Sequence, residues 1–425
     1  MGLPREQMGT GMLFNLYSAA TTVASPVIAA GMAFSARGRR RFGERLGSWK
    51  TLPPLDWWLH GASVGEVQGL LPCVDEIRAR SETEKILLTS TSPTGLDRGE
   101  SRVDATRLLP LDAAWCVRRA LRSVNAKRFV LSETELWPVF LREVVGRGIP
   151  CYVVNGRVSD YTIRWYQSLR SLFQPIMSEF HSVCVPNNEQ RERYQMLGVQ
   201  PSRIHVTGHT KYDVEPKIVS AGDARVARET LVPHWGADEP IIVLGSIRPG
   251  EEDAWFGALA SVWTMGKRAR VIVAPRHMEK LDYFEDKLKK VGARYVRWSQ
   301  VNSRPDADVI ILDVMGKLES AYSIASLAFV GATLVDIGGH NPLEPAMYGV
   351  PVVVGPYTSV IRDVVGEMRE ARGILEVAEG EDLSSLVERS ISREGSLVDL
   401  GKKGQTVWLR HRGAAKRVVS IIAGE

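Results

Sequence analysis

Short apolar runs alternate with segments of helical periodicity along most of the 425-residue chain. Between the runs, stretches such as 67–80 and 117–124 carry apolar residues every three or four positions. Strands that alternate with helices predict a parallel sheet with right-handed crossovers. The strands predicted for the first half are 57–59, 86–89, 129–131, 152–155, 183–185 and 204–206.

The same alternation stops over residues 213–240 and then restarts. It predicts a second doubly wound unit, so the fold class is α/β with two Rossmann-like domains and a cleft between them. We predict an N-terminal segment 1–49, a first domain 50–220 and a second domain 221–425, with a helix at 407–423 packing back across the junction. The second set of predicted strands is 241–245, 271–274, 309–313, 327–331 and 352–355.

The N-terminus differs from the rest because residues 11–36 carry no charge. At a rise of about 1.5 Å per residue, such a helix crosses a hydrocarbon core of roughly 30 Å. Its serines, threonines and Pro26 leave open a helix that lies on the membrane or docks on the domain. We expect a single N-terminal anchor, with the domains on the cytoplasmic side by the positive-inside rule. The basic residues that follow, each adding about 1 kcal/mol toward an anionic leaflet, are Arg37, Arg39, Arg40, Arg41 and Arg45.

Composition narrows the possible functions. A net charge of +5 is a modest, diffuse excess that suits an anionic substrate or membrane surface and does not indicate nucleic acid. The four cysteines are far apart, which predicts reduced thiols and neither a disulfide framework nor a zinc site. GxGxxG after the first strand and GxxxxGK[ST] are both missing from the sequence, which disfavours a nicotinamide dehydrogenase and a P-loop NTPase.

The segment HGASVGE ends at Glu66, where the first predicted strand passes into a helix. Gly61 and Gly65 allow close approach of a ligand to the backbone. A carboxylate at this turn is a candidate to take a proton from an attacking hydroxyl. The alternative is a first-turn glutamate that only complements the helix dipole, and spacing alone favours neither.

Three more segments follow strand ends in the first half. SETELWP contains Glu133 and Glu135, of which we expect one to bind or catalyse and the other to be structural. The alternative is an ordinary helix start, which Pro138 supports. Arg157 and Lys211 add positive charge at the same edge and suit phosphate or carboxylate groups, although a solvated loop charge is the default for each.

In the second half, Pro275 and Arg276 end one strand, and GGHNPLEP (338–345) follows another. Glycines, Asn341 as a possible N-cap and Pro342 at the first helical position predict a helix N-terminus suited to an anion. Glu344 in that turn is a candidate acceptor for ribose hydroxyls.

Taken together, eight segments resemble the 3-deoxy-D-manno-octulosonic acid (Kdo) transferases of lipopolysaccharide assembly. They occur in the family's order and cover nearly the whole chain. The segments are WLHGASVGEV, LTSTSPTGLDR, SETELWP, NGRVSD, TGHTKYD, APRH, DVMGKL and GGHNPLEPAMYGVPVVVGP.

The resemblance implies an inverting GT-B glycosyltransferase that takes CMP-Kdo as donor and a lipid A precursor of the lipid IVA type as acceptor at the inner membrane. It implies no metal ion or other cofactor. Glu66 matches the family's general base, and Glu133 and Lys211 match residues that stabilise the transition state. We add Ser63 and Arg157 as candidates for the acceptor side. The residues matching segments that hold CMP are Pro275, Arg276, Met315, Gly316, Lys317, Asn341, Pro342, Leu343 and Glu344.

The chain departs from the family at a few positions. Relatives usually carry glutamate where Lys317 stands, so a side-chain role there does not carry over, whereas a role of the backbone amides does. Two other functions remain as alternatives: a GT-B-like nucleotide-sugar epimerase, which would gain nothing from a membrane anchor, and a non-catalytic membrane-bound nucleotide-sugar-binding protein.

Overall fold

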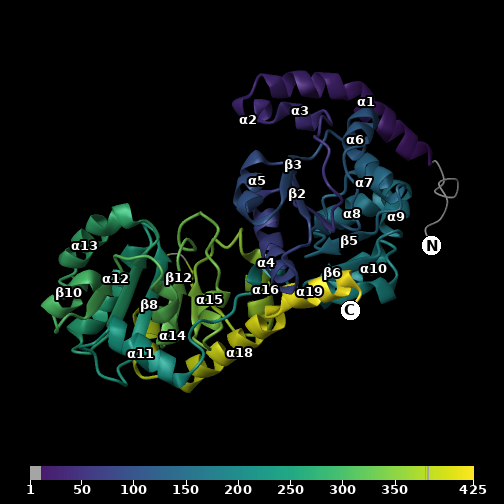
Figure 1. The fold of residues 1–425 in the computed structure, drawn as a ribbon. Helices are drawn as coiled ribbons and strands as arrows, with labels where there is room; N and C mark the ends of the chain where they lie inside the picture. Colours follow the sequence, from purple (N-terminus) through teal and green to yellow (C-terminus); the bar gives the residue numbers. More distant parts are fainter. Residues whose placement is uncertain (1–10, 379, 381) are drawn as a thin grey trace. The chain divides into compact units, whose positions relative to one another are not determined.

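The computed structural model describes residues 11–378, 380 and 382–425, which form two compact units (Figure 1). Unit 1 contains the chain up to Asp213 together with His411–Glu425, and unit 2 contains Val214–Arg410. The contacts therefore divide the chain at 213/214, where the sequence analysis drew the boundary at 220/221. The C-terminal segment belongs to unit 1.

Unit 1 is built on a seven-stranded parallel sheet with the order β3-β2-β1-β4-β5-β6-β7. Its strands are β1 (Trp57–His60), β2 (Ile86–Ser90), β3 (Ala105–Leu108), β4 (Phe129–Ser132), β5 (Cys151–Val154), β6 (Ser182–Val185) and β7 (Ile204–Val206). Its helices are α1 (Met12–Ala33), α2 (Ala36–Arg39), α3 (Phe42–Arg45), α4 (Val64–Arg80), α5 (Pro93–Gly99), α6 (Ala114–Leu121), α7 (Pro138–Val145), α8 (Asp160–Ser168), α9 (Arg170–Met177), α10 (Asn188–Met196) and α19 (Ala414–Ala423), with short 3-10 turns at Glu100–Arg102, Pro201–Arg203 and Thr210–Tyr212.

Strand β1 shows why this sheet has a core on each face. Its side chains alternate, so that Trp58 packs with Phe129 and Phe140 on one face, while Trp57 and Leu59 pack on the other. The second face is completed by α4 and by the C-terminal helix α19, whose apolar side chains join the same cluster. Helix α19 is therefore part of the core of unit 1.

Unit 2 repeats the architecture with the strand order β10-β11-β9-β8-β12-β13-β14, all parallel. Its strands are β8 (Ile241–Ile247), β9 (Arg270–Pro275), β10 (Tyr295–Arg297), β11 (Val309–Ile311), β12 (Leu327–Val330), β13 (Val352–Val354) and β14 (Leu375–Glu376). Its helices are α11 (Ala221–Leu231), α12 (Glu252–Thr264), α13 (Leu281–Lys290), α14 (Leu318–Ser323), α15 (Leu343–Ala346), α16 (Arg362–Glu370), α17 (Ser384–Ile391) and α18 (Gly395–His411), with 3-10 turns at Met278–Lys280 and Trp298–Ser303.

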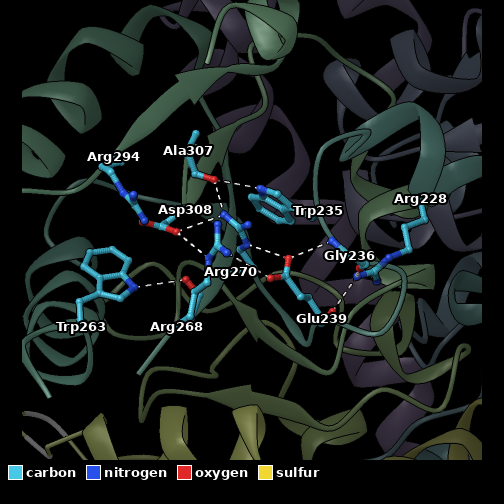
Figure 2. A network of polar contacts seen from close by, with 11 residues as sticks. Arg228, Trp235, Gly236, Glu239, Trp263, Arg268, Arg270, Arg294, Ala307 and Asp308 are labelled. Carbon is cyan, nitrogen blue, oxygen red and sulfur yellow. Dashed lines mark hydrogen bonds and ion pairs between the residues drawn. The ribbon is translucent and has the colours of Figure 1, made fainter. Parts of the chain in front are cut away.

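The amino-terminal edge of the second sheet is closed by a network of paired charges (Figure 2). Arg270, the first residue of β9, donates to Glu239 (2.9 Å) and to Asp308 (3.1 Å). Its guanidinium also lies 5.0 Å from the ring centroid of Trp235. Arg270 is only 3% exposed, so these partners compensate for the loss of water around a buried cation.

Not all of the basic residues after the apolar N-terminal segment are available to a membrane. Arg45 is buried and donates to the Thr91 carbonyl (3.0 Å). Arg41 pairs with Glu44 (2.9 Å) and Arg40 pairs with Asp97. The expectation that all five arginines face a leaflet is wrong for Arg45, whose side chain belongs to the packing of unit 1.

Candidate functional site

In each sheet the strand order reverses next to the first strand of the unit, and the candidate residues lie at these two reversals; the second sheet has a further change of order at its edge, where β11 lies inside β10. In the first sheet the reversal lies between β1 and β4, whose following loops carry Glu66, Glu133 and Glu135. In the second it lies between β8 and β12, whose following loops carry Arg248 and the segment 338–345. Ligands of open α/β sheets bind outside the carboxyl ends of the strands at such positions.

Glu66 lies in the first turn of α4 and is 7% exposed. Its carboxylate accepts a hydrogen bond from the Ala62 N–H (2.7 Å), while its own N–H donates to the hydroxyl of Ser63, the N-cap (3.2 Å). Burial raises the pKa of Glu66, and the hydrogen bonds from Ala62 and Ser63 partly oppose that shift. The side chain is thus both a helix-capping group and a buried carboxylate whose affinity for a proton is increased.

The turn that presents Glu66 requires glycine at position 61. A Cβ atom there would lie 2.9 Å from the backbone nitrogen of Val67, closer than packing allows. Gly65 has no such restriction, since a Cβ would meet only the Ser63 hydroxyl at 3.8 Å. The close approach of β1 to α4 therefore explains Gly61 structurally.

The two glutamates after β4 have different environments. Glu133 adopts a left-handed backbone conformation (φ 56°), and its N–H donates to the Val154 carbonyl (2.8 Å). Glu135 is exposed at the surface of unit 1, yet desolvation by the surrounding protein raises its pKa, and the charge of Glu66 raises it further. The carboxylate that the structure couples to Glu66 is therefore Glu135.

The loop carrying Lys211 is held against α4 by Asn155 and Thr210. The Asn155 side chain accepts from the Thr210 N–H (2.9 Å) and donates to the Thr210 hydroxyl (2.8 Å), which in turn donates to the Gly69 carbonyl. Both side chains are fully buried. This network fixes the loop after β7 on the helix whose first turn carries Glu66.

His209 shows that Lys211 and Arg157 lie in one neighbourhood. Burial lowers the pKa of His209 to about 3, and the charges of His411, Lys211 and Arg157 lower it further. The imidazole is therefore neutral at physiological pH. Its Nδ1 accepts from the Lys211 N–H (3.1 Å), so it positions the loop and adds no charge.

In unit 2, cationic and imidazole groups gather beyond β8, β9 and β12. The pKa of His340 is lowered to about 4, chiefly by burial and to a smaller extent by the charges of Arg276, Arg248 and His277. Arg248 and His277 are hydrogen-bonded to each other. Arg276 is exposed, and its guanidinium has no hydrogen bond or ion pair with any residue that the structure describes. The two arginines of this group can bind a phosphate, whereas the His340 imidazole is neutral near pH 7 because of its lowered pKa.

A buried carboxylate joins the two loops that carry this group. Glu251 is inaccessible to solvent and accepts hydrogen bonds from the N–H groups of Arg248 (2.8 Å), Ala332, Thr333 and Leu334 (each 2.9 Å). These N–H groups come from the loops after β8 and β12, so Glu251 fixes the positions of the two loops relative to one another.

Helix α15 begins one residue later than the sequence pattern predicted. It begins at Leu343, has four residues and takes Pro342 as its N-cap, although the Asn341 side chain still accepts from the Leu343 N–H (3.0 Å). One turn carries only a small dipole, so attraction for an anion at this edge comes chiefly from the arginines. Burial and the charge of Glu319 raise the pKa of Glu344 to about 6, against an opposing effect of Arg276.

The segment Met315, Gly316 and Lys317 lies in the loop after β11. Met315 is exposed, and Gly316 has a positive φ of 82° that favours glycine. The Lys317 ammonium lies 4.9 Å from the ring centroid of Trp298. The residue that departs from the family pattern thus has a packing partner within its own unit.

Sequence reasoning did not single out Arg248 or Glu251. The residues alone left the choice between Glu133 and Glu135 open, and the family resemblance selected Glu133. Arg248 follows β8 by one residue, so its place at the carboxyl end of a central strand was a usable signal. Glu251 gave no signal, because its role depends on N–H groups about eighty positions away in the sequence. Across the described ranges, no three His, Cys, Asp or Glu side chains form a group that could hold a metal ion.

Comparison with known proteins gives a consistent family match. Residues 40–214 match the family model described as 3-deoxy-D-manno-octulosonic-acid transferase (kdotransferase). The chain is 30% identical over 398 residues to the 3-deoxy-D-manno-octulosonic acid transferase of Haemophilus influenzae, covering 91% of this chain and 92% of the relative. It is 31% identical to the enzyme of that name from Chlamydophila psittaci, over 71% of this chain and 69% of the relative.

Among solved structures, the UDP-GlcNAc 2-epimerase of Neisseria meningitidis matches with a TM-score of 0.55 and 11% identity, over 88% of this chain and all of that one. Anabaena HepE in complex with UDP matches with a TM-score of 0.50 and 12% identity, over 88% of this chain and all of that one. At these identities the likeness concerns the fold alone. The predicted α/β fold with two Rossmann-like units of the GT-B type is confirmed.

Proposed function

The chain belongs to the 3-deoxy-D-manno-octulosonic acid (Kdo) transferase family, a glycosyltransferase family, and from that premise we propose that it transfers Kdo from CMP-Kdo to a lipid A precursor of the lipid IVA type. We propose an inverting displacement. The acceptor hydroxyl oxygen attacks the anomeric carbon of Kdo, the bond from that carbon to the phosphate oxygen breaks, and CMP leaves with the electron pair.

The observation that carries this proposal is the contrast in charge between the two strand-order reversals. The edge in unit 1 presents two carboxylates with raised pKa values, Glu66 and Glu135, and the edge in unit 2 presents two arginines, Arg248 and Arg276, around the buried Glu344. Glycosyl transfer to a hydroxyl requires a base for the acceptor proton and positive charge for the departing phosphate. Each requirement is met by a different unit.

Glu66 is the proposed base. Its buried carboxylate holds a proton more tightly than an exposed glutamate, which brings its pKa closer to that of a working base near neutral pH. The Ala62 N–H fixes its orientation. We assign Lys211 and Glu133 to stabilising the transition state, and Ser63 and Arg157 to the acceptor side.

For the donor, we propose that Arg276 binds the CMP phosphate and that Arg248 adds to the field. Glu344 accepts hydrogen bonds from ribose hydroxyls. Pro275, Gly316 and the segment from Asn341 to Leu343 contribute backbone and shape, and Met315 contributes an apolar surface. A cation at the leaving phosphate stabilises the charge that develops there as the glycosidic bond breaks.

Because the proposed acceptor is a lipid, we also propose that the enzyme works at the inner membrane with its two units on the cytoplasmic side. Helix α1 is long and apolar enough to attach to a membrane. Attachment would raise the effective concentration of acceptor at the active site.

The test is Glu66→Gln in the purified full chain, incubated with CMP-Kdo and lipid IVA, with the product identified by its mass. The glutamine amide oxygen still accepts from the Ala62 N–H, so the helix cap is retained while the base is lost. We expect turnover to fall by about 10² or more, with CMP binding and thermal stability close to those of the wild type.

Glu76→Gln is the matched control, because Glu76 lies on the same helix and pairs with Arg80 at the surface. It should retain turnover. Near-normal turnover of Glu66→Gln would remove Glu66 as the base and direct attention to Glu133 and Glu135. A wild-type chain that binds CMP-Kdo but forms no product would instead support the non-catalytic alternative.

A further inference from the structure

Helix α1 has its apolar and polar faces reversed relative to an ordinary surface helix. Its solvent-exposed side carries an apolar stripe that repeats every three or four residues, from Met12 (78% exposed) through Val23 (79%) to Phe34 (87%). No charged residue interrupts residues 11–35. The exposed members of this stripe, hereafter the outer stripe, are Met12, Leu16, Ala19, Ala20, Val23, Val27, Ala30 and Phe34.

The opposite side of α1 carries hydroxyl groups and faces unit 1. The Tyr17 hydroxyl donates to Asp112 (2.9 Å), and the Trp115 indole N–H donates to the Ser25 hydroxyl (3.0 Å). The Arg142 guanidinium lies 3.9 Å from the ring centroid of Phe14. Helix α1 also contacts α6 and α9, so it is docked along its length (Figure 1).

We propose that α1 lies in the plane of the membrane interface, with the outer stripe among the lipid acyl chains and the hydroxyl face held on unit 1, and that it does not cross the bilayer. This inference rests on the proposed membrane attachment and specifies its geometry.

The length of α1 does not decide between lying and crossing, since its 22 residues suffice for either. The contacts between α1 and unit 1 distinguish a helix that lies in the interface from one that crosses the bilayer. A crossing helix would have to leave Asp112, Arg142 and Trp115, or carry charged side chains of unit 1 into hydrocarbon, where each costs several kcal/mol. A helix in the interface keeps all of these contacts and still buries its outer stripe.

The pattern also identifies lipid as the occupant. The outer stripe runs the full length of the helix without a charge, and Asn15 is the one exposed polar side chain along α1. At its C-terminal end Arg39 is exposed, and a cation beside an apolar face suits anionic headgroups. A second copy of the chain packed on the stripe is the competing occupant, and the experiment below separates the two.

A second element of unit 1 has the composition of a membrane interface. Helix α8 exposes Tyr161 and Trp165 one turn apart, with Arg164 beside them, and it contacts α9, which α1 also contacts. Tyrosine and tryptophan are enriched where headgroups meet water. We assign this pair to the same membrane contact.

The test measures the depth of spin labels on α1 in vesicles of phosphatidylethanolamine and phosphatidylglycerol. Single cysteines replace Leu16, Val23 and Val27 on the outer stripe and Thr21 on the inner face, and the four native cysteines are buried and hence unreactive. If α1 lies in the membrane plane, the three outer labels should lie at one shallow depth and collide with oxygen. The label at position 21 should be immobilised and shielded from oxygen.

Three results would overturn the proposal. A depth that is greatest near Val23 and falls toward both ends would mean a crossing helix. Labels at 16, 23 and 27 that remain in water would mean that lipid does not cover the stripe, and immobilised outer labels with strong spin–spin coupling would mean a second copy of the chain.

A binding measurement with a matched control completes the test. Val23→Glu with Val27→Glu should reduce partitioning onto these vesicles by at least about tenfold, whereas Val226→Glu, at an exposed valine of unit 2, should leave it unchanged. Equal partitioning of both variants would contradict the proposal. Kdo transfer to lipid IVA in detergent is scored separately, so failure of the reaction and failure of the membrane geometry give different results.

Discussion

Arg270 and Arg276 stand at opposite ends of the same strand and differ in almost every physical respect. Arg270 begins β9, is 3% exposed and has Glu239, Asp308 and the Ala307 carbonyl as partners. Arg276 follows the last residue of β9, is exposed, and has no side-chain partner among the residues that the structure describes. Its neighbours include another arginine and two histidines.

The difference separates charges that hold the fold from charges kept available for a ligand. A buried cation must be compensated within the protein, or the fold loses several kcal/mol. Arginines whose side chains have no ion pair at a carboxyl-terminal sheet edge, where Glu344 is the acidic group that Arg276 influences, contribute little to stability by themselves. They are the arrangement expected where an anion supplies the missing partner.

The largest effect should come from removing Arg270, the buried and compensated arginine at the start of β9. Arg270→Met removes the buried cation that Glu239 and Asp308 share and leaves them with the half-exposed Arg268, and we expect the free energy of unfolding to fall by about 3–5 kcal/mol. Denaturant unfolding measures the loss, and CMP affinity under native conditions should be retained. A variant as stable as the wild type would show that Arg268 and Arg294, which also contact Asp308, compensate alone.

The complementary substitution is at Arg276, the exposed arginine at the other end of β9. Arg276→Met removes the proposed charge-assisted bond to phosphate and should weaken CMP binding by about 1.5–3 kcal/mol, or roughly 10- to 100-fold. Its free energy of unfolding should stay within about 0.5 kcal/mol of the wild type, because the side chain is exposed. Calorimetric titration with CMP measures the affinity. Unchanged affinity would mean that the nucleotide binds elsewhere.

The central strands of both sheets were predictable from sequence, as was the edge strand β7, whereas the other three edge strands were missed. Strands β1, β4, β8 and β9 are continuous apolar runs because both of their faces are buried. The missed strands, β3, β10 and β14, lie at sheet edges, where polar residues alternate with apolar ones or the strand has only two or three residues. Segments of this kind differ little from loops in hydrophobicity, so the apolar pattern that predicted the central strands is weaker at the edges of the sheets.

The candidate site was predictable where a residue stands directly after a central strand, as Arg276 does, or in a glycine-rich turn that follows one, as Glu66 does. Glu251 also follows a central strand, but its function was hidden. It accepts four backbone N–H groups from two loops that come together only in the fold. The coupling of Glu66 to Glu135 likewise depends on the adjacency of β1 and β4, which are more than sixty residues apart in the chain.

Glu344 gives a pH-dependent test at the uncompensated edge. Its pKa is raised from 4.5 to about 6, chiefly by burial, so the folded state holds the proton more tightly than the unfolded state. Stability should therefore fall as pH rises from 4.5 through 6. Relative to Glu344→Gln, which does not titrate, the wild type should lose about 2 kcal/mol over this range. Parallel stability curves for the two proteins would contradict the raised pKa.

The smallest expected effect concerns Lys317, where the chain departs from its family. The ammonium lies over the Trp298 ring, and a partly exposed contact of this kind contributes about 0.5–1 kcal/mol to stability. If the loop serves the donor through the backbone at Gly316, whose positive φ shapes the turn, then Lys317→Met should lose only that contact. CMP affinity should change by less than about threefold, measured beside Arg276→Met under the same conditions. A loss of affinity as large as that of Arg276→Met would place the Lys317 ammonium on the nucleotide, and the uncompensated cations of this edge would then include a residue that the family pattern does not contain.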